Sequence, residues 1–243
     1  MRSSLYRVIS AAMMAAVFGL MANVAFANKV EVNINNGKDI FEKGKGAAAA
    51  CNSCHGQSGT GDDAMGTPRL VKLGYPYIVK QLTDFAEDKR IDTTLSVMNI
   101  FAKELSVADR RDVAAYLESL TVEMPASNME DIKKLGQPVG QSHLGKRIVF
   151  EGITEKGISA CSSCHGYNGR GVAPLYPAIG KQRYVYLVTQ LKKWRDGSRA
   201  NDILSQMQKV AKNLSDDDIY NVSAYLTKAP LTSRGNSRIP VNH

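Results

Sequence analysis

Apolar residues recur at spacings of three and four along much of the chain, which gathers side chains on one face of an α-helix. Two such stripes occupy residues 77–85 and 185–194. Their members are Tyr77, Ile78, Gln81, Leu82 and Phe85 in one stripe, and Val185, Leu187, Val188, Leu191 and Trp194 in the other. No segment shows the convincing alternation of apolar and polar residues that predicts a β-strand. We therefore expect an all-α fold.

A second pair of helices is predicted by capping signals. Ser106 followed by Asp109, and Ser215 followed by Asp218, have the spacing at which a serine and an acidic residue close the first turn of a helix. The stripes that follow are Val113, Tyr116, Leu117 and Leu120 in one case, and Ile219, Val222, Tyr225 and Leu226 in the other. Each helix is expected to open at its serine.

The predicted helices belong to an internal duplication with a period near 109 residues. Residues 98–117 match residues 207–226, with Met, Ala, Leu-Ser, Asp, Val and Ala-Tyr-Leu at the same offsets. Gly37 to Ile40 also matches Gly145 to Ile148. We expect the first helix of each copy to begin near these glycines and, in the first copy, to run on into the alanines before residue 51. The chain is therefore interpreted as two copies of one helical domain.

The segments outside the two copies have a different composition. Prolines and glycines mark a linker at residues 121–139, between a first domain at residues 28–120 and a second domain at residues 140–229. A short helix is expected in this connector near residues 129–135. Residues 230–243 are rich in Ser, Asn, Arg and Pro and are expected to form a flexible tail.

The first 27 residues have the pattern of an export signal. Arg2 and Arg7 precede an apolar run from Val8 to Leu20, and Ala25-Phe26-Ala27 is a small-residue cleavage pattern. An uncleaved membrane anchor is disfavoured because the apolar stretch is short. We therefore predict cleavage after residue 27 and a periplasmic location.

The formal net charge of +8 is unevenly distributed. Residues 28–126 hold 12 basic and 14 acidic side chains, whereas residues 127–243 hold 17 basic and 9 acidic side chains. Such a charge dipole can orient a molecule against a charged partner. Nucleic-acid binding is not expected, because the chain is predicted to be exported and lacks a basic cluster interleaved with aromatic residues.

All four cysteines lie in two copies of the pattern C-x-x-C-H, at residues 51–55 and 161–165. This pattern is the attachment signature of a c-type haem. The cysteines form thioethers to the porphyrin, and the histidine becomes the fifth ligand of the iron. The predicted attachment residues are Cys51, Cys54, Cys161 and Cys164, and the predicted fifth ligands are His55 and His165. We therefore expect two covalently bound haem c groups.

The sixth iron ligands are predicted from the duplication. Met207 is the only methionine after His165, and Met98 occupies the matching position in the first copy. Met65, Met124 and Met129 are other methionines of the first half, but they lie too close to the first motif or in the connector. A lone methionine usually fills space in a core. The repeated position favours axial ligation by Met98 and Met207, which is typical of an electron carrier of relatively high potential.

The remaining candidate side chains carry weaker predictions. His143 and His243 are expected to be solvated surface groups. Arg69, Lys72, Lys181 and Arg183 are candidates to neutralise haem propionates.

Three shared patterns make the chain resemble the diheme cytochrome c4 family. They are the tandem C-x-x-C-H-G-x-x-G-x-G motifs, the P-x(12)-Q-L segments and the M-x-x-x-A-x-x-L-S-x-x-D tails, which together span about residues 37–228. The resemblance implies two class I cytochrome c folds about a pseudo-twofold axis, with haem propionates near the interface. It also implies a periplasmic electron shuttle that feeds a terminal oxidase and is often associated with the membrane.

The leading hypothesis is a soluble carrier of single electrons that is not itself an enzyme. Its expected partners are redox proteins, namely a terminal oxidase, a quinol-oxidising complex or a dehydrogenase. The alternative is a cytochrome subunit of a dehydrogenase complex, since flavocytochrome c sulfide dehydrogenase has a similar subunit.

A diheme peroxidase would need an exchangeable sixth site, and a diheme thiosulfate dehydrogenase would be expected to use a cysteine ligand, for which no cysteine is left. A third hypothesis treats the cysteine pairs as thiol redox or zinc motifs, but it gives the histidines and methionines no role. The physiological donor and acceptor, the order of the haem potentials and the oligomeric state stay open.

Overall fold

Helices joined by loops form the regular structure of residues 31–231, the part of the chain that the computed structural model describes. Four isolated β-bridges occur in this part, and it contains no extended strand. The all-α prediction is therefore confirmed. The predicted export signal at residues 1–27 and residues 232–243 of the predicted tail lie outside the described residues.

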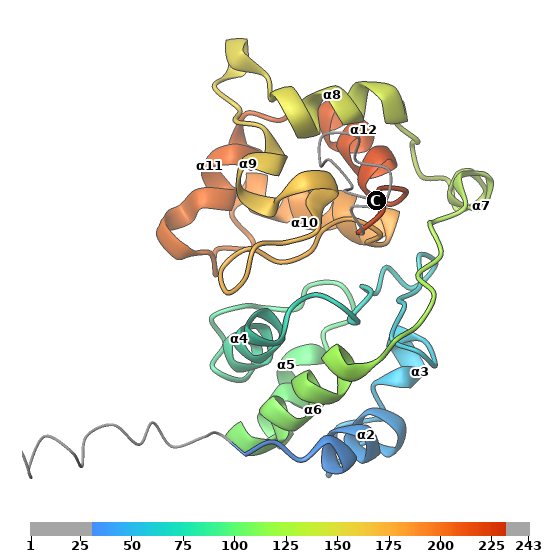
Figure 1. The fold of residues 1–243 in the computed structure, drawn as a ribbon, viewed down its shortest axis with the longest axis vertical. Coiled ribbons are helices and arrows are strands. Elements are labelled where there is room, and N and C mark those ends of the chain that lie inside the picture. Colours follow the sequence, from blue (N-terminus) through green and yellow to red (C-terminus); the bar gives the residue numbers. More distant parts are fainter. Residues whose placement is uncertain (1–30, 232–243) are drawn as a thin grey trace, which may run out of the picture. The chain divides into compact units, whose positions relative to one another are not determined.

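Each repeat supplies five α-helices in the same order (Figure 1). The first repeat contains α2 (Ile34–Lys43), α3 (Asn52–His55), α4 (Tyr75–Ala86), α5 (Met98–Glu104) and α6 (Val107–Ser119). The second contains α8 (Ser142–Glu151), α9 (Cys161–His165), α10 (Tyr184–Asp196), α11 (Gln206–Lys212) and α12 (Asp216–Leu226). The short α7 (Met129–Lys134) lies in the connector, as the sequence predicts.

The first and last helices of each repeat pack against each other, α2 on α6 and α8 on α12. Close approach is possible because Gly37 and Gly145 lie at the crossings. A Cβ atom on Gly37 would fall 2.1 Å from the carbonyl oxygen of Asp112, and one on Gly145 would fall 1.8 Å from that of Asn221. These glycines, which the duplication singled out, are therefore needed for backbone contact between the terminal helices.

Helix α2 ends earlier than the sequence predicts. It stops at Lys43, and Gly44 follows with a φ of 82° while its amide donates to the carbonyl of Ile40. The alanines at residues 47–50 lie in the loop beyond this stop. The prediction of a helix running into them was wrong because the glycine at the C-terminus, with its left-handed conformation, outweighs the helix propensity of alanine.

The predicted capping boxes are present at α6 and α12. In the first, the amide of Asp109 donates to the Ser106 hydroxyl at 3.1 Å, and the amide of Ser106 donates to the Asp109 carboxylate at 2.9 Å. Asp109 also accepts hydrogen bonds from Lys45 at 2.7 Å and from Asn36 at 3.0 Å. One buried carboxylate therefore caps α6 and ties it to the first helix of the repeat.

Replacing Asp109 with asparagine is expected to destabilise the protein at pH 7 by about 1 to 2 kcal/mol. Burial by itself raises the pKa of the Asp109 carboxyl, but hydrogen bonds from Lys45, Asn36 and Ser106 outweigh it and hold the pKa below its usual value. A lowered carboxyl pKa contributes stability above the unfolded value near 4, and this contribution is lost as the pH falls through the folded value. Urea unfolding at pH 7 and pH 3 should show a deficit in the variant that shrinks in acid.

The matched control is Asp39→Asn, because the Asp39–Lys43 ion pair is exposed and such pairs contribute little. A deficit of Asp109→Asn that is the same at both pH values would contradict the ionic role of this carboxylate.

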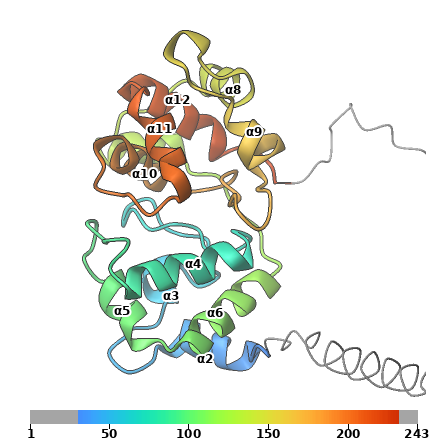
Figure 2. The ribbon, with the colours of Figure 1, turned by 90° about the vertical axis from the view of Figure 1, so that its left-hand side faces the viewer.

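The two repeats pack into one compact unit that begins at Asn33, and Figure 2 shows α4 and α10 on their facing sides. Arg69 makes several hydrogen bonds between them and is fully buried. Its guanidinium donates to the carbonyl oxygens of Ala178 (3.1 Å), Gly180 (2.9 Å) and Lys181 (3.1 Å) in the second repeat, and to that of Val71 in its own. The Gln182 side chain also accepts from the Arg69 amide at 2.7 Å and donates to the Arg69 carbonyl at 3.0 Å.

Arg183 makes a second contact between the repeats. It donates to the carbonyls of Thr60 at 2.8 Å and Gly61 at 3.1 Å, and its guanidinium lies 3.7 Å from the Asp63 carboxylate. The sequence offers Arg69 and Arg183 as partners of haem propionates. The structure instead uses them to bind the backbone of the opposite repeat.

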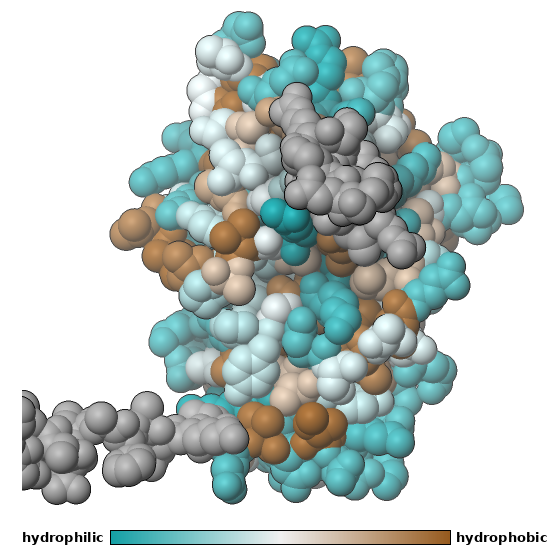
Figure 3. Space-filling model, viewed as in Figure 1, coloured by the Kyte–Doolittle hydropathy of each residue, from teal (hydrophilic) through white to brown (hydrophobic). Residues whose placement is uncertain are grey.

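The face of the molecule seen in Figure 3 is largely hydrophilic, with apolar groups scattered over it. Among the described residues, none of the helices has the length and apolar character that crossing a membrane requires.

Candidate haem centres

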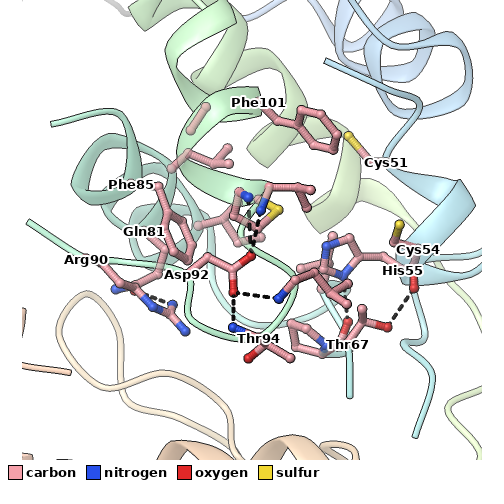
Figure 4. Close-up of a pocket in the computed structure, with 18 of the residues that line it drawn as sticks. Cys51, Cys54, His55, Thr67, Gln81, Phe85, Arg90, Asp92, Thr94 and Phe101 are labelled. Atoms are coloured by element: carbon pink, nitrogen blue, oxygen red, sulfur yellow. Dashed lines mark hydrogen bonds between the residues drawn. The ribbon is translucent and has the colours of Figure 1, made fainter. Parts of the chain in front are cut away.

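A large cavity lies in the first repeat, with an empty volume of about 1350 Å³ that includes a part open to solvent. Its lining is mainly apolar and includes Cys51, Cys54, His55 and Met98. Figure 4 shows the two cysteines and His55 on one side of the cavity, and Phe85 and Arg90 on the other. The structure therefore brings together the four residues that the sequence predicts for the first haem.

His55 is oriented by the backbone. Its Nδ1 lies 3.0 Å from the carbonyl oxygen of Pro68, and because a carbonyl only accepts, Nδ1 carries the proton. This leaves the Nε2 lone pair for a metal, the usual arrangement for a ligating histidine. Burial lowers the pKa of His55, although the Pro68 carbonyl opposes this shift, so the imidazole is held in the neutral form that binds iron.

The second repeat reproduces this arrangement. Nδ1 of the buried His165 lies 2.9 Å from the carbonyl oxygen of Pro177, and Pro177 corresponds to Pro68 in the duplication. Burial lowers the pKa of His165 as well. The ring of Tyr176 meets the imidazole edge-on, with centroids 5.9 Å apart, and fixes its orientation further.

The cysteines lie on single helical turns at α3 and α9. Cysteines three residues apart on such a turn point to the same side, as two attachment bonds to one porphyrin require. Burial raises the pKa of the Cys51 and Cys161 thiols to about 11. A thiol redox motif needs a lowered thiol pKa, so the burial of Cys51 and Cys161 disfavours the thiol redox hypothesis.

Met98 begins α5, and Met207 lies within α11. The sequence predicts neither of these short helices. An aspartate positions each methionine: the Asp92 carboxylate accepts from the amide of Met98 at 3.3 Å, and the Asp202 carboxylate accepts from the amide of Met207 at 2.6 Å. Sequence reasoning missed both aspartates. The available signal was an acidic residue five or six positions before each repeated methionine.

Two buried arginines join the repeats beside the first cavity. Arg90 donates to Gln81 of its own repeat at 2.6 Å, and to Tyr186 and Gln190 of the other, each at 3.0 Å. Arg199 donates to Gln190 of its own repeat at 2.8 Å, and to Tyr77 and Gln81 of the first repeat, each at 3.2 Å. Sequence reasoning missed this network, although Arg90 and Arg199 are separated by the repeat period.

The environment of these arginines tests whether the site suits a haem. Arg90 and Arg199 are 8% and 5% exposed, and their guanidinium groups stack on the rings of Phe85 and Trp194. Within residues 31–231 their hydrogen-bond partners are neutral, and no carboxylate pairs with either. A buried charge without a counter-charge is costly. Both arginines line the first cavity. Their positive charges therefore suit a haem whose anionic propionates would lie on the arginine side of that cavity.

Of the other histidines, His143 is exposed at the start of α8. His243 lies outside the described residues. Met65 is 38% exposed and lies on the loop between α3 and α4.

Comparison with known proteins gives consistent relatives. The Cytochrome c family model matches residues 34–121 and 144–230. A thiosulfate dehydrogenase electron acceptor from Thiomonas intermedia (strain K12) is 37% identical over 186 residues, which cover 76% of this chain and 81% of that protein. Cytochrome c4 of Pseudomonas aeruginosa is 33% identical over 185 residues, covering 75% of this chain and 85% of that protein.

A solved structure of the thiosulfate dehydrogenase from Marichromatium purpuratum superposes with a TM-score of 0.73 at 30% identity. The match covers 82% of this chain and 41% of that one, so this chain spans less than half the length of that protein.

Two helical repeats, each with a Cys-x-x-Cys-His turn, define a diheme c-type cytochrome. The chain belongs to the cytochrome c family, as a diheme member of the cytochrome c4 type. It carries two covalently bound haem c groups, and it acts as an electron carrier that exchanges electrons with redox partners rather than as a catalyst.

Proposed function

We propose that the protein is a periplasmic carrier that accepts single electrons from a thiosulfate-oxidising dehydrogenase and passes them to a terminal oxidase or another acceptor. The observation that carries the proposal is the cavity of the first repeat, which brings together the backbone-oriented His55 and Met98, whose amide is held by Asp92. The second repeat has the same histidine and methionine contacts at His165 and Met207. A bound haem would supply the reversible one-electron change of its iron, and the protein would supply two ligands of that iron.

The proposed iron ligands are His55 and Met98 in the first repeat, and His165 and Met207 in the second. Met98 lines the same cavity as His55, with its amide anchored by Asp92. Two protein ligands leave no position open for a substrate, which favours a carrier over an enzyme. Two protein ligands that are held by the fold would stay in place in both oxidation states, so few atoms would need to move on electron transfer.

The proposed donor rests on the relatives. Two of them, at 37% and 35% identity, are electron acceptors of thiosulfate dehydrogenase. This supports the dehydrogenase alternative of the sequence prediction, with thiosulfate dehydrogenase as the donor in place of flavocytochrome c sulfide dehydrogenase. The periplasmic location is supported by the export pattern in residues 1–27. Peripheral association with a membrane stays a hypothesis.

Mixing the oxidised protein with thiosulfate and a catalytic thiosulfate dehydrogenase is expected to reduce both haems, as followed by their visible absorption bands. Thiosulfate without the dehydrogenase should leave the haems oxidised, because a carrier with two protein ligands on each iron would not oxidise thiosulfate itself. Sulfide with a flavoprotein sulfide dehydrogenase is the matched alternative donor.

Faster reduction by the sulfide system would contradict the proposed donor. Carbon monoxide binding to the resting protein, or a high-spin haem spectrum, would contradict the carrier role itself, because either result requires an open sixth position.

A further inference from the structure

Some of the charges around the interface between the repeats are matched in pairs. Arg90 corresponds to Arg199 at the period of 109 residues, and both bind the same kinds of neutral partner. Asp92 and Asp202 have the same role toward their methionines. Asp92 and Asp202 are therefore expected to affect the two haems in similar ways, whereas Arg90 and Arg199 both line the first cavity. A charge without a counterpart would make them unequal.

Lys193 is such a charge. It lies on α10 of the second repeat but lines the cavity of the first. Its ammonium donates to the Thr94 hydroxyl at 2.7 Å, in the loop that leads to Met98. The side chain is half-buried, and among the described residues no carboxylate lies within 4.0 Å of the ammonium. The second repeat therefore places a positive charge beside the first haem centre, and no carboxylate of the described residues forms an ion pair with it.

The first repeat has no lysine at the position that corresponds to Lys193. Asp84 occupies the position that corresponds to Lys193, and Thr189 occupies the position that corresponds to Lys80. The Asp84 carboxylate forms an ion pair with Lys80 and accepts from the Asn201 amide group at 2.5 Å. At this position the first repeat therefore has an ion pair with no net charge, whereas the second repeat has a cation.

We propose that Lys193 raises the reduction potential of the first haem across the interface and leaves the second haem largely unaffected. The inference rests on the proposed function, since it takes the first cavity as the haem site. Ferric haem is one unit more positive than ferrous haem, so a fixed cation nearby favours the reduced form. The interior of a protein screens such a charge less than water does. Lys193 therefore biases an incoming electron toward the first haem.

Lys193→Gln in the holoprotein tests this inference. The potential of each haem is read separately from its own haem-methyl resonances in an NMR redox titration. The equilibrium constant for electron transfer from the second haem to the first is expected to fall about threefold to tenfold, a tenfold change corresponding to about 59 mV for one electron. Lys193→Arg should keep the wild-type constant, because it keeps the charge. Thr94→Val, which removes the hydrogen bond but no charge, should stay closer to wild type than Lys193→Gln does.

The matched control is Lys192→Gln, which removes the same charge one residue away. Lys192 donates to Tyr220 at 2.9 Å and to Asp216 at 3.1 Å within its own repeat, so the equilibrium constant should change little. An unchanged first-haem potential in Lys193→Gln, or equal shifts of both haems, would overturn the inference. Failure of the proposed function appears differently, as a wild-type spectrum without low-spin methionine-ligated haem or as no reduction by the dehydrogenase.

Discussion

Replacing Met207 with histidine is expected to lower the reduction potential of the second haem by on the order of 0.1 V, within the range of roughly 0.8 V that axial ligands span. A thioether favours ferrous iron, whereas a second imidazole stabilises ferric iron. The Asp202 carboxylate holds the Met207 amide at 2.6 Å, so the backbone of residue 207 should stay in place in the variant. The first haem belongs to a separate repeat and should keep its potential to a first approximation.

A redox titration that resolves the two haems measures this result, and loss of half the near-infrared band of methionine-bound ferric haem should accompany it. Met98→His is the reciprocal variant and should move only the first haem. Met65→Leu is the control, because Met65 is partly exposed on a loop and is not a proposed ligand. Equal movement of both haems in either histidine variant would contradict the assignment of one ligand set to each repeat.

Replacing Arg69 with methionine is expected to lower the free energy of unfolding by about 3 kcal/mol and to loosen the contact between the repeats. The variant keeps apolar volume but removes every side-chain donor to the four carbonyls that Arg69 binds. An unsatisfied buried polar group costs about 1 to 3 kcal/mol. Part of this cost is offset, because the variant no longer buries a charge. The pKa of Arg69 is lowered to about 10, with burial as the largest cause.

Urea unfolding followed by circular dichroism and by haem absorbance checks the prediction. Arg147→Met removes an arginine whose side chain is 72% exposed and should change the stability little. If Arg69→Met does not fold, Gln182→Ala is the milder probe, because it removes only the two hydrogen bonds to the Arg69 backbone. A stability of either variant equal to that of the Arg147 control would contradict the role of Arg69 in joining the repeats.

The haem-attachment residues were predictable because their chemistry is local. Two cysteines and a histidine on one helical turn reach one porphyrin whatever the rest of the fold does. The choice of Met98 needed the duplication, since its distance along the chain from His55 carries no signal. The structure then placed Met98 on the cavity that His55 lines.

The interface residues were not predictable in the same way. Arg69 has Ala178 as its counterpart in the second repeat, so comparison of the repeats gives no sign that it matters. Its partners are backbone carbonyls more than one hundred positions away, and such contacts leave no residue pattern to read. The helices α5 and α11 were also missed, because each has only seven residues and no side-chain cap of its own.

The sequence by itself determined the helical class, the duplication, the capped last helices and the residues that attach two haems, because each follows from contacts within a few positions or from repetition. Only the tertiary structure decided where α2 stops, which arginines face the haem cavity and which join the repeats. It also decided that Lys193 lines the cavity of the opposite repeat. These outcomes depend on which surfaces meet when the two repeats pack, and that packing sums weak contacts between residues far apart in the chain.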